Sequence, residues 1–378
     1  MAVNTIINAA TLAITAWSIG DSLKGQKNNP DNDITVSLIT GMSLPHQDAN
    51  IGGSIPHIAA WDENGNRIGQ YKGDANGHID EDGSKTFTIK PTQNGGHQTS
   101  PEYLLFVMQE TDAICVPGIV ASGNGNQWTW TGDMSYTCDA QWYPSKRTIG
   151  TSNTAVKCVW LDEDHSNGII AKGLSLHMRD FTGDQALVDQ YKKNQARLCQ
   201  NSARMTFQPD IYPDGLIDIF RPPLQYTDDG GAPKNPNRGI DRKKRAYPDG
   251  TFMHPKKANS RRHTRDFEAL TGNATASAVS GIKNMIPDHL VISNLPDHNA
   301  KHVCEHPTSL GPDFVSTVEK IFCDMDTGKW WPLCDATTNE ACFDLDTRTM
   351  RNYKPGRMRA RTEENTVPDK NYKHHEEW

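Results

Sequence analysis

Apolar residues repeat with two different periods along the chain. Between residues 5 and 23 they recur every three or four positions, which predicts one amphipathic N-terminal helix. From about residue 33 to residue 180 hydrophobic and polar residues alternate instead, as in Ile34–Ile39, and turns rich in Gly, Asn and Asp separate the runs. Many strands with hairpin turns and no intervening helices predict a mainly β (α+β) fold, an antiparallel β-sandwich or jelly-roll-like domain.

The second half of the chain divides into shorter segments. A helical pattern over residues 183–205 predicts a helix that closes the sandwich, residues 282–295 are typical of a strand, and residues 297–305 and 313–322 are typical of helices. The predicted organisation is an N-terminal helix (1–30), a β-sandwich domain with its closing helix (31–207), a basic Pro/Gly-rich linker or loop (208–268), a Cys-containing C-terminal lobe (269–350) and a polar tail (351–378).

Composition excludes a membrane-spanning helix. Only 35% of the 378 residues are hydrophobic, the mean hydropathy is -0.68, and no stretch approaches 18 consecutive apolar residues. We therefore expect a soluble protein.

The cysteines favour an oxidising compartment. There are eight, in two sets of four: Cys115, Cys138, Cys158 and Cys199, then Cys304, Cys323, Cys334 and Cys342. The closest pair leaves seven residues between its members, which does not fit the Cys-x2-Cys spacing of a zinc site. Disulfides, and with them an extracellular protein, are the favoured interpretation; eight reduced thiols are the alternative.

Processing signals agree only in part with secretion. The first residues lack the basic region and the cleavage site of a signal peptide. By contrast, Asn273 begins an N-glycosylation sequon, and the pairs Lys244-Arg245 and Arg261-Arg262 are typical targets of a kexin-type secretory protease. Together with the cysteines these sites predict a processed secretory protein.

A basic segment lies between Lys234 and Arg265. It contains eleven Lys or Arg and two Asp, a local charge of +9, although the whole chain carries -7. Nucleic-acid binding is disfavoured because the segment has only Tyr247 and Phe252 as aromatic residues and no helical pattern. A protease-accessible loop, or a contact with the acidic sandwich domain, is the favoured interpretation.

Several ordered stretches resemble a group of uncharacterised fungal proteins that are mostly predicted to be secreted. The stretches are residues 127–133, Cys138, residues 142–144, 302–304, 310–315, 322–325 and 331–334. The resemblance implies a fungal, secreted and disulfide-bonded protein of unknown function, and it carries over no activity.

One acidic loop resembles the middle of a calcium-binding loop. Its candidate ligands are Asp74, Asn76, Asp80 and Asp82. In this alignment Lys72 takes the first ligand position and Gly83 takes the position of the bidentate acid, so the two strongest ligands are missing. The alternatives are a looser calcium site, which would make calcium the one cofactor to consider, and a polar loop between strands.

Two further patterns could support chemistry. His298, His302 and His306 recur every four residues, as metal ligands on one helix face would, or as a plain surface stripe. Pairs of carboxylates such as Asp162 with Asp164, and Asp324 with Asp326, could serve a glycosidase if their separation were suitable. No nucleophile elbow, phosphate loop, dinucleotide fingerprint or zinc-protease helix is present in the sequence.

Aromatic residues provide the last candidate site. Trp128, Trp130, Trp142 and Tyr143 could stack on sugar rings, or they could form the core. The favoured hypothesis is a noncatalytic secreted protein that binds a cell-wall or host glycan or a protein partner. A hydrolase with a carboxylate site between the lobes, and a proprotein or assembly component cleaved in the dibasic linker, are the alternatives, so enzyme activity stays open.

Overall fold

The computed structural model describes residues 33–41, 52–74, 77–80, 83–93, 100–136, 138, 140–149, 154–194, 197–198, 201–224, 283–352 and 367–378. The predicted N-terminal helix, both dibasic pairs and Asn273 lie outside these ranges. The chain divides into two compact units: unit 1 comprises Met1–Ser43 and Asn50–Thr264, and unit 2 comprises Leu44–Ala49 and Arg265–Trp378. Each unit is described by itself.

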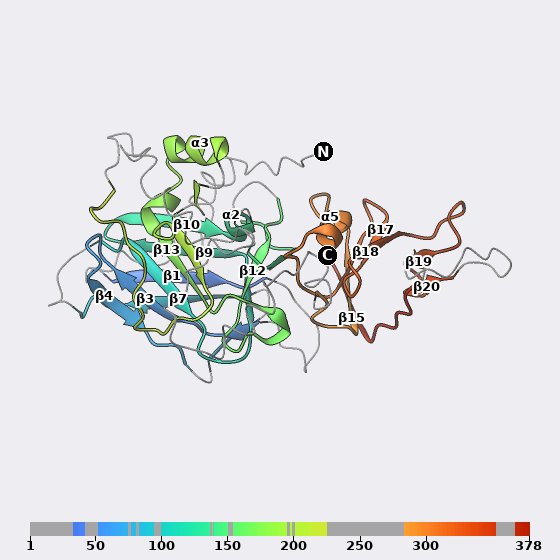
Figure 1. Cartoon of the computed structure of the whole chain (residues 1–378), viewed down its shortest axis with the longest axis horizontal. Coiled ribbons are helices and arrows are strands. Elements are labelled where there is room, and N and C mark those ends of the chain that lie inside the picture. Colours follow the sequence, from blue (N-terminus) through green and yellow to red (C-terminus); the bar gives the residue numbers. More distant parts are fainter. Residues whose placement is uncertain are drawn as a thin grey trace, which may run out of the picture. The chain divides into compact units, whose positions relative to one another are not determined.

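Unit 1 is built from antiparallel sheets, as the alternating pattern predicts (Figure 1). A four-stranded sheet has the order β10 (Asn126–Thr131), β9 (Gly118–Gly123), β1 (Ile34–Ile39) and β6 (Ser84–Ile89). A five-stranded sheet has the order β14 (Met205–Gln208), β13 (Gly173–His177), β7 (Tyr103–Val107), β3 (His57–Trp61) and β4 (Arg67–Tyr71). Smaller sheets contain β11 (Trp142–Tyr143), β12 (Cys158–Leu161) and β8 (Ile114–Val116), and β2 (Gly53–Ser54) with β5 (His78–Ile79).

Both faces of the five-stranded sheet are covered. On β7, Leu104 and Phe106 belong to the main core, which they share with residues of the four-stranded sheet. Leu105 and Val107, on the opposite face, pack with a second cluster to which Phe220 belongs. Residues 209–224, at the start of the predicted linker, therefore contribute to the core of unit 1. This double burial explains why β7 is a continuous apolar run rather than an alternating one.

Hairpin turns join neighbouring strands where the sequence predicts them. Asn124 and Gly125 connect β9 to β10 with φ values of 47° and 77°, a left-handed pair that matches the twist of the strands. Between β3 and β4 the Asp62 carboxylate accepts hydrogen bonds from the backbone N–H groups of Asn64 and Asn66, at 2.9 and 2.8 Å. Local side-chain chemistry thus fixes both turns.

The closing helix is shorter than predicted. Helix α3 (Gln185–Lys193) ends at Asn194, whose φ of -148° and ψ of 88° leave the helical region. Met205, which the sequence pattern places in the helix, begins β14 and pairs with Leu176. The prediction of a helix over residues 183–205 is wrong at its C-terminal end because backbone pairing with β13 overrides the helical spacing there. Short helical turns α2 (Gly132–Tyr136), η2 (Ser166–Gly168) and η3 (Met178–Phe181) complete unit 1.

Unit 2 contains a mixed sheet in the order β18 (Lys329–Pro332), β17 (Ile321–Asp324), β16 (Asp313–Ser316), β15 (His289–Ser293) and β21 (His374–Glu377). Strand β15 is parallel to both of its neighbours. The parallel connection from β15 to β16 carries helix α5 (Ala300–Glu305), as such crossovers usually do. A hairpin of β19 (Cys342–Asp344) and β20 (Thr349–Arg351) completes the unit (Figure 1).

Three expectations for unit 2 need correction. Helix α5 begins at Ala300 rather than at residue 297, and the side chain of its N-cap, Asn299, accepts a hydrogen bond from the backbone N–H of His302. The predicted helix over 313–322 is the β16–β17 hairpin, in which Val315 lies opposite Phe322. The described end of the predicted polar tail is a strand, since residues 374–377 form β21, bonded through the backbone to β15.

Disulfides occur in both units, as the cysteine count predicts. Cys115 is bonded to Cys158, Cys304 to Cys323 and Cys334 to Cys342. Cys138 is also disulfide-bonded, whereas Cys199 lies outside the described ranges. Among the described helices, none has the length and apolar character needed to cross a membrane.

Candidate binding pocket

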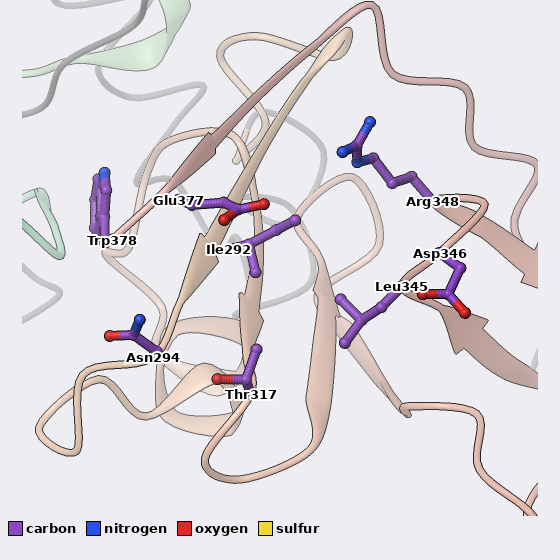
Figure 2. Close-up of a pocket in the computed structure, with 8 residues that line it drawn as sticks. All are labelled: Ile292, Asn294, Thr317, Leu345, Asp346, Arg348, Glu377 and Trp378. Carbon is purple, nitrogen blue, oxygen red and sulfur yellow. The ribbon is translucent and has the colours of Figure 1, made fainter.

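A pocket with a cavity volume of about 410 Å³ lies between the mixed sheet and the β19–β20 hairpin of unit 2. Its walls come from four separate segments: the end of β15, the residue after β16, the β19–β20 turn, and the end of β21. The lining residues are Ile292, Asn294, Thr317, Leu345, Asp346, Arg348, Glu377 and Trp378 (Figure 2).

The pocket has an apolar floor and a polar rim. Ile292 is buried and Leu345 is partly buried, whereas Asp346 and Glu377 are exposed. Figure 2 shows Glu377 on the sheet side and Arg348 on the hairpin side of the space that Leu345 faces. Such an arrangement suits a ligand with one apolar face and several hydrogen-bonding groups.

Backbone pairing holds the sheet side of the pocket in place. The N–H of Trp378 donates to the carbonyl of Ile292 at 2.8 Å, and the N–H of Asn294 donates to the carbonyl of Trp378 at 2.9 Å. The Trp378 ring packs edge-on against the rings of His298 and Phe314, with centroids 5.4 and 6.0 Å away. This ring lies on the face of the sheet opposite Ile292, because Ile292 pairs with Val315 and Glu377, so the backbone bonds fix the sheet side of the pocket.

The hairpin side depends on a turn that occurs twice in unit 2. Asp344-Leu-Asp-Thr347 repeats the pattern of Asp324-Met-Asp-Thr327, and in each turn the first Asp accepts the N–H of the second, at 2.9 and 3.1 Å. A left-handed residue follows in both: Gly328 with a φ of 65°, and Arg348 with a φ of 53°.

Arg348 thus occupies a backbone position that its counterpart turn gives to glycine. A left-handed conformation costs an ordinary residue about 1 kcal/mol or more. Arg348 bears this cost and extends its guanidinium over the pocket (Figure 2). Strain of this kind is concentrated at functional sites.

The lining residues provide charged and polar groups that can bind a ligand. Two carboxylates and one guanidinium provide acceptors and donors, and Asn294 provides both. The sequence prediction of a carboxylate-based hydrolase places its site between the two lobes, which is a different location.

The aromatic residues proposed for sugar stacking lie in the core of unit 1. Trp128, Trp130 and Trp142 are 1–2% exposed, and Tyr143 is fully buried. A buried ring offers no face to a ligand, so the prediction of a glycan site at these residues is wrong. Their large apolar area fills the sandwich, which is poor in aliphatic side chains.

The predicted calcium loop is described only in part, because Asn76 and Asp82 fall outside the described residues. The backbone carbonyls of Asp74 and Asp80 accept the N–H groups of Gly77 and Gly83, at 2.8 and 3.0 Å. These bonds close turns between neighbouring strands, in line with the alternative of a polar loop.

The histidine stripe does not form one face of a helix. His298 precedes α5, is buried and shares a 2.7 Å hydrogen bond with the Ser293 hydroxyl. The rings of His302 and His306 lie 5.2 Å apart, but His306 is already the C-cap residue with extended backbone.

The carboxylate pair Asp324 and Asp326 surrounds a lysine. The Nζ of Lys370 lies 2.6 Å from Asp324, 2.5 Å from Asp326 and 2.9 Å from Asp313. Among the described residues, these three aspartates have carboxylate oxygens close enough together to hold a metal ion. The ammonium of Lys370 lies between them. We call Lys370 and the three aspartates the Lys370 centre.

Charge and burial shift the pKa values in this centre. Burial raises the pKa of Asp313 to about 6, although Lys370 and the hydroxyl of Tyr372 act in the opposite direction. Burial alone would lower the pKa of Lys370, but the surrounding carboxylates raise it above its usual value.

Unit 1 contains a second buried charged cluster. The Asp180 carboxylate accepts hydrogen bonds from the hydroxyl of Tyr191 at 2.6 Å and from the guanidinium of Arg204, and it bonds the His177 ring at 2.8 Å. Burial opposes ionisation, yet Arg204 and then His177 lower the pKa of Asp180 to about 2. We call these four residues the Asp180 centre. Its side chains are almost completely buried, which favours a structural role.

Sequence reasoning missed the pocket residues. The one sequence feature that points to the pocket is the repeated Asp-x-Asp-Thr turn, which places Arg348 where the earlier turn has Gly328. No known family model matches the chain, and no curated protein matches it.

Proposed function

We propose that this is a noncatalytic secreted protein that binds a saccharide of a cell wall or host surface through the pocket of unit 2. The observation that carries the proposal is the apolar floor beneath a rim of Asn294, Asp346, Arg348 and Glu377. A pyranose ring has an apolar face and a circle of hydroxyl groups, so it matches this distribution of lining groups.

The disulfides support an extracellular location, because such bonds persist in oxidising compartments. A fungal source, glycosylation and dibasic processing are sequence-based parts of the same proposal.

Glycan-array binding by the full disulfide-bonded chain tests this function, followed by calorimetry with the saccharide retained. We expect Arg348→Gly to weaken binding at least tenfold, which corresponds to the loss of a charge-assisted hydrogen bond. Stability should stay unchanged or rise, because glycine removes the left-handed strain. This combination separates a binding role from a structural one.

Asp346→Asn is the second pocket variant, and it should also weaken binding. Trp330→Ala is the control, since Trp330 is an exposed aromatic residue, 40% accessible, that does not line the pocket. Absence of retention on the array and on insoluble polysaccharides would refute saccharide binding. Binding that survives both pocket variants but is lost in Trp330→Ala would move the site elsewhere.

A further inference from the structure

The charged side chains of the unit 2 pocket do not neutralise one another. Asp346, Arg348 and Glu377 line the same space, yet none of the three forms an ion pair with another described residue. The Nε of Arg348 is buried and has no hydrogen-bond partner among the described side chains and backbone. Charged groups that lack a protein partner in a cleft are available to a ligand.

The two acids reach the pocket from separate elements. Glu377 pairs with Ile292 across β21 and β15, so its side chain leaves the sheet on the same face as Ile292. Asp346 belongs to the β19–β20 turn, where its backbone N–H donates to the Asp344 carboxylate at 2.9 Å. In Figure 2, Ile292 and Leu345 lie between the two carboxylates. Backbone pairing and the turn therefore hold both acids beside the apolar floor.

The charge of the pocket follows from these residues. Its described lining carries two carboxylates and one guanidinium, an excess of one negative charge. A single exposed ion pair contributes little in water, but a cleft lined by an excess of one sign favours ligands of the opposite sign. An acidic saccharide would add to the negative charge, and a neutral one would leave it unbalanced. A saccharide with a positive charge complements it.

We propose, on the basis of the saccharide binding proposed above, that the ligand carries a free amino group, as 2-amino-2-deoxy sugars do. Its ammonium faces the carboxylates of Glu377 and Asp346. Arg348 donates to a ring or hydroxyl oxygen, and the apolar face of the sugar lies on Ile292. N-acetylation replaces the ammonium by a neutral amide, so it removes the charge that the two acids attract. The ligand class is therefore the de-N-acetylated form of an amino-sugar polymer.

Calorimetry of the full disulfide-bonded chain with two matched probes tests this class. The probes are the tetramers of glucosamine and of N-acetylglucosamine, at about pH 6, where an aliphatic amine is protonated. The glucosamine tetramer should bind about fivefold more tightly, the effect of one favourable ion pair. Raising the salt from about 0.1 to about 1 M shortens the screening length from about 10 to about 3 Å and should remove most of this preference. Tetralysine, which has the same net charge as the glucosamine tetramer, controls for attraction to a chain of net charge -7 and should bind about tenfold more weakly than that tetramer.

Variants assign the preference to the pocket. Glu377→Gln and Asp346→Asn, both at exposed positions, should each reduce the preference for the glucosamine tetramer to about twofold or less. Arg348→Gly should weaken the binding of both tetramers but enlarge the preference, because it removes the positive charge that repels the ammonium. Asp369→Asn is the matched control and should leave both affinities unchanged, since Asp369 is an exposed acid of unit 2 that does not line the pocket.

Equal affinity for the two tetramers, or tighter binding of the N-acetylated one, would overturn the amino-sugar class and leave saccharide binding itself in place. Retention of neutral saccharides alone on the array would have the same meaning. A preference that survives both Glu377→Gln and Asp346→Asn, or equally tight binding of tetralysine, would overturn the role of the pocket acids. Absence of every saccharide from the array would instead refute the proposed function, so the two failures are distinguishable.

Discussion

The Asp180 centre of unit 1 and the Lys370 centre of unit 2 have opposite designs. In unit 1 one carboxylate is surrounded by donors from Arg204, Tyr191 and His177. In unit 2 one ammonium is surrounded by three carboxylates, of which two are buried and one is half exposed. The first cluster balances its charge, whereas the second keeps an excess of negative charge. A buried charged group is stable in either design only while its specific counter-charge is present.

Removal of Arg204, the counter-charge of Asp180 in unit 1, should have the largest effect on stability. Arg204→Met leaves Asp180 buried without its guanidinium, and we expect a loss of about 3–5 kcal/mol in the free energy of unfolding. Hydrogen exchange of the full chain, followed by mass spectrometry, should show faster exchange in β13 and β14. Arg351→Met is the control in unit 2: Arg351 pairs with Asp344 at a half-exposed position, so about 1 kcal/mol or less is expected. Equal losses of unfolding free energy in the two variants would contradict the idea that burial makes the Asp180 ion pair more important than the exposed one.

Removal of one disulfide from each unit should lower the free energy of unfolding by an amount that depends on the length of the loop that the disulfide closes. The Cys115–Cys158 bond joins residues 43 positions apart, and the Cys334–Cys342 bond joins residues eight apart. On the loop-entropy relation, replacing each pair by Ala should cost about 4 and about 2.5 kcal/mol, respectively. Denaturant unfolding of the two double variants measures the difference. A larger loss for the short loop would show that entropy of the unfolded chain does not set the order.

The response to pH should differ in sign between the two centres. The pKa of Asp180 is lowered to about 2, so its contribution to stability is present above pH 4 and is lost as the pH falls from about 4 to 2. The pKa of Asp313 is raised to about 6, so the folded state holds this proton more tightly, and stability rises by roughly 1–3 kcal/mol as the pH falls from above 6 to about 4.

Variants isolate these two contributions, because other groups titrate in the same range. Asp313→Asn should remove the part of the pH dependence between 4 and 6 that hydrogen exchange detects in β15 and β16. Asp180→Asn should remove the acid-side loss in β7 and β13. An unchanged profile for Asp313→Asn would contradict the excess negative charge assigned to the Lys370 centre.

The N-caps of helices α5 and α3 should give the smallest difference in stability. Asn299 caps α5 through a 2.6 Å bond from the backbone N–H of His302, whereas Asp184 precedes α3 without a side-chain capping bond. Asn299→Ala should therefore cost about 1 kcal/mol, and Asp184→Ala clearly less. Local hydrogen exchange in the two helices measures both values. A cost for Asp184→Ala as large as that for Asn299→Ala would mean that charge near the helix N-terminus matters more than the capping bond.

The sequence predicts the features that depend on local patterns. Alternation in Ile34–Ile39 and the Asn124-Gly125 turn predict strands and a hairpin that the structure contains. β21 was missed because His374-His-Glu-Glu377 has no apolar alternation and is held by backbone pairing to a strand 85 residues earlier. The sequence does not predict the pocket for a similar reason, because the walls of the pocket come from segments far apart in sequence. The burial of Trp128 and its neighbours also depends on the packing of whole sheets, which side-chain type alone does not reveal.

The parallel pairing of β21 with β15 has a consequence for protein synthesis. Residues 367–378 leave the ribosome after the rest of unit 2, and Lys370 is among them. Until then β15 has an open edge, and Asp313, Asp324 and Asp326 lack their lysine. Unit 2 should therefore complete its fold only after this last segment has been released, and a nascent chain stalled before it should offer β15 as a template for wrong strand partners.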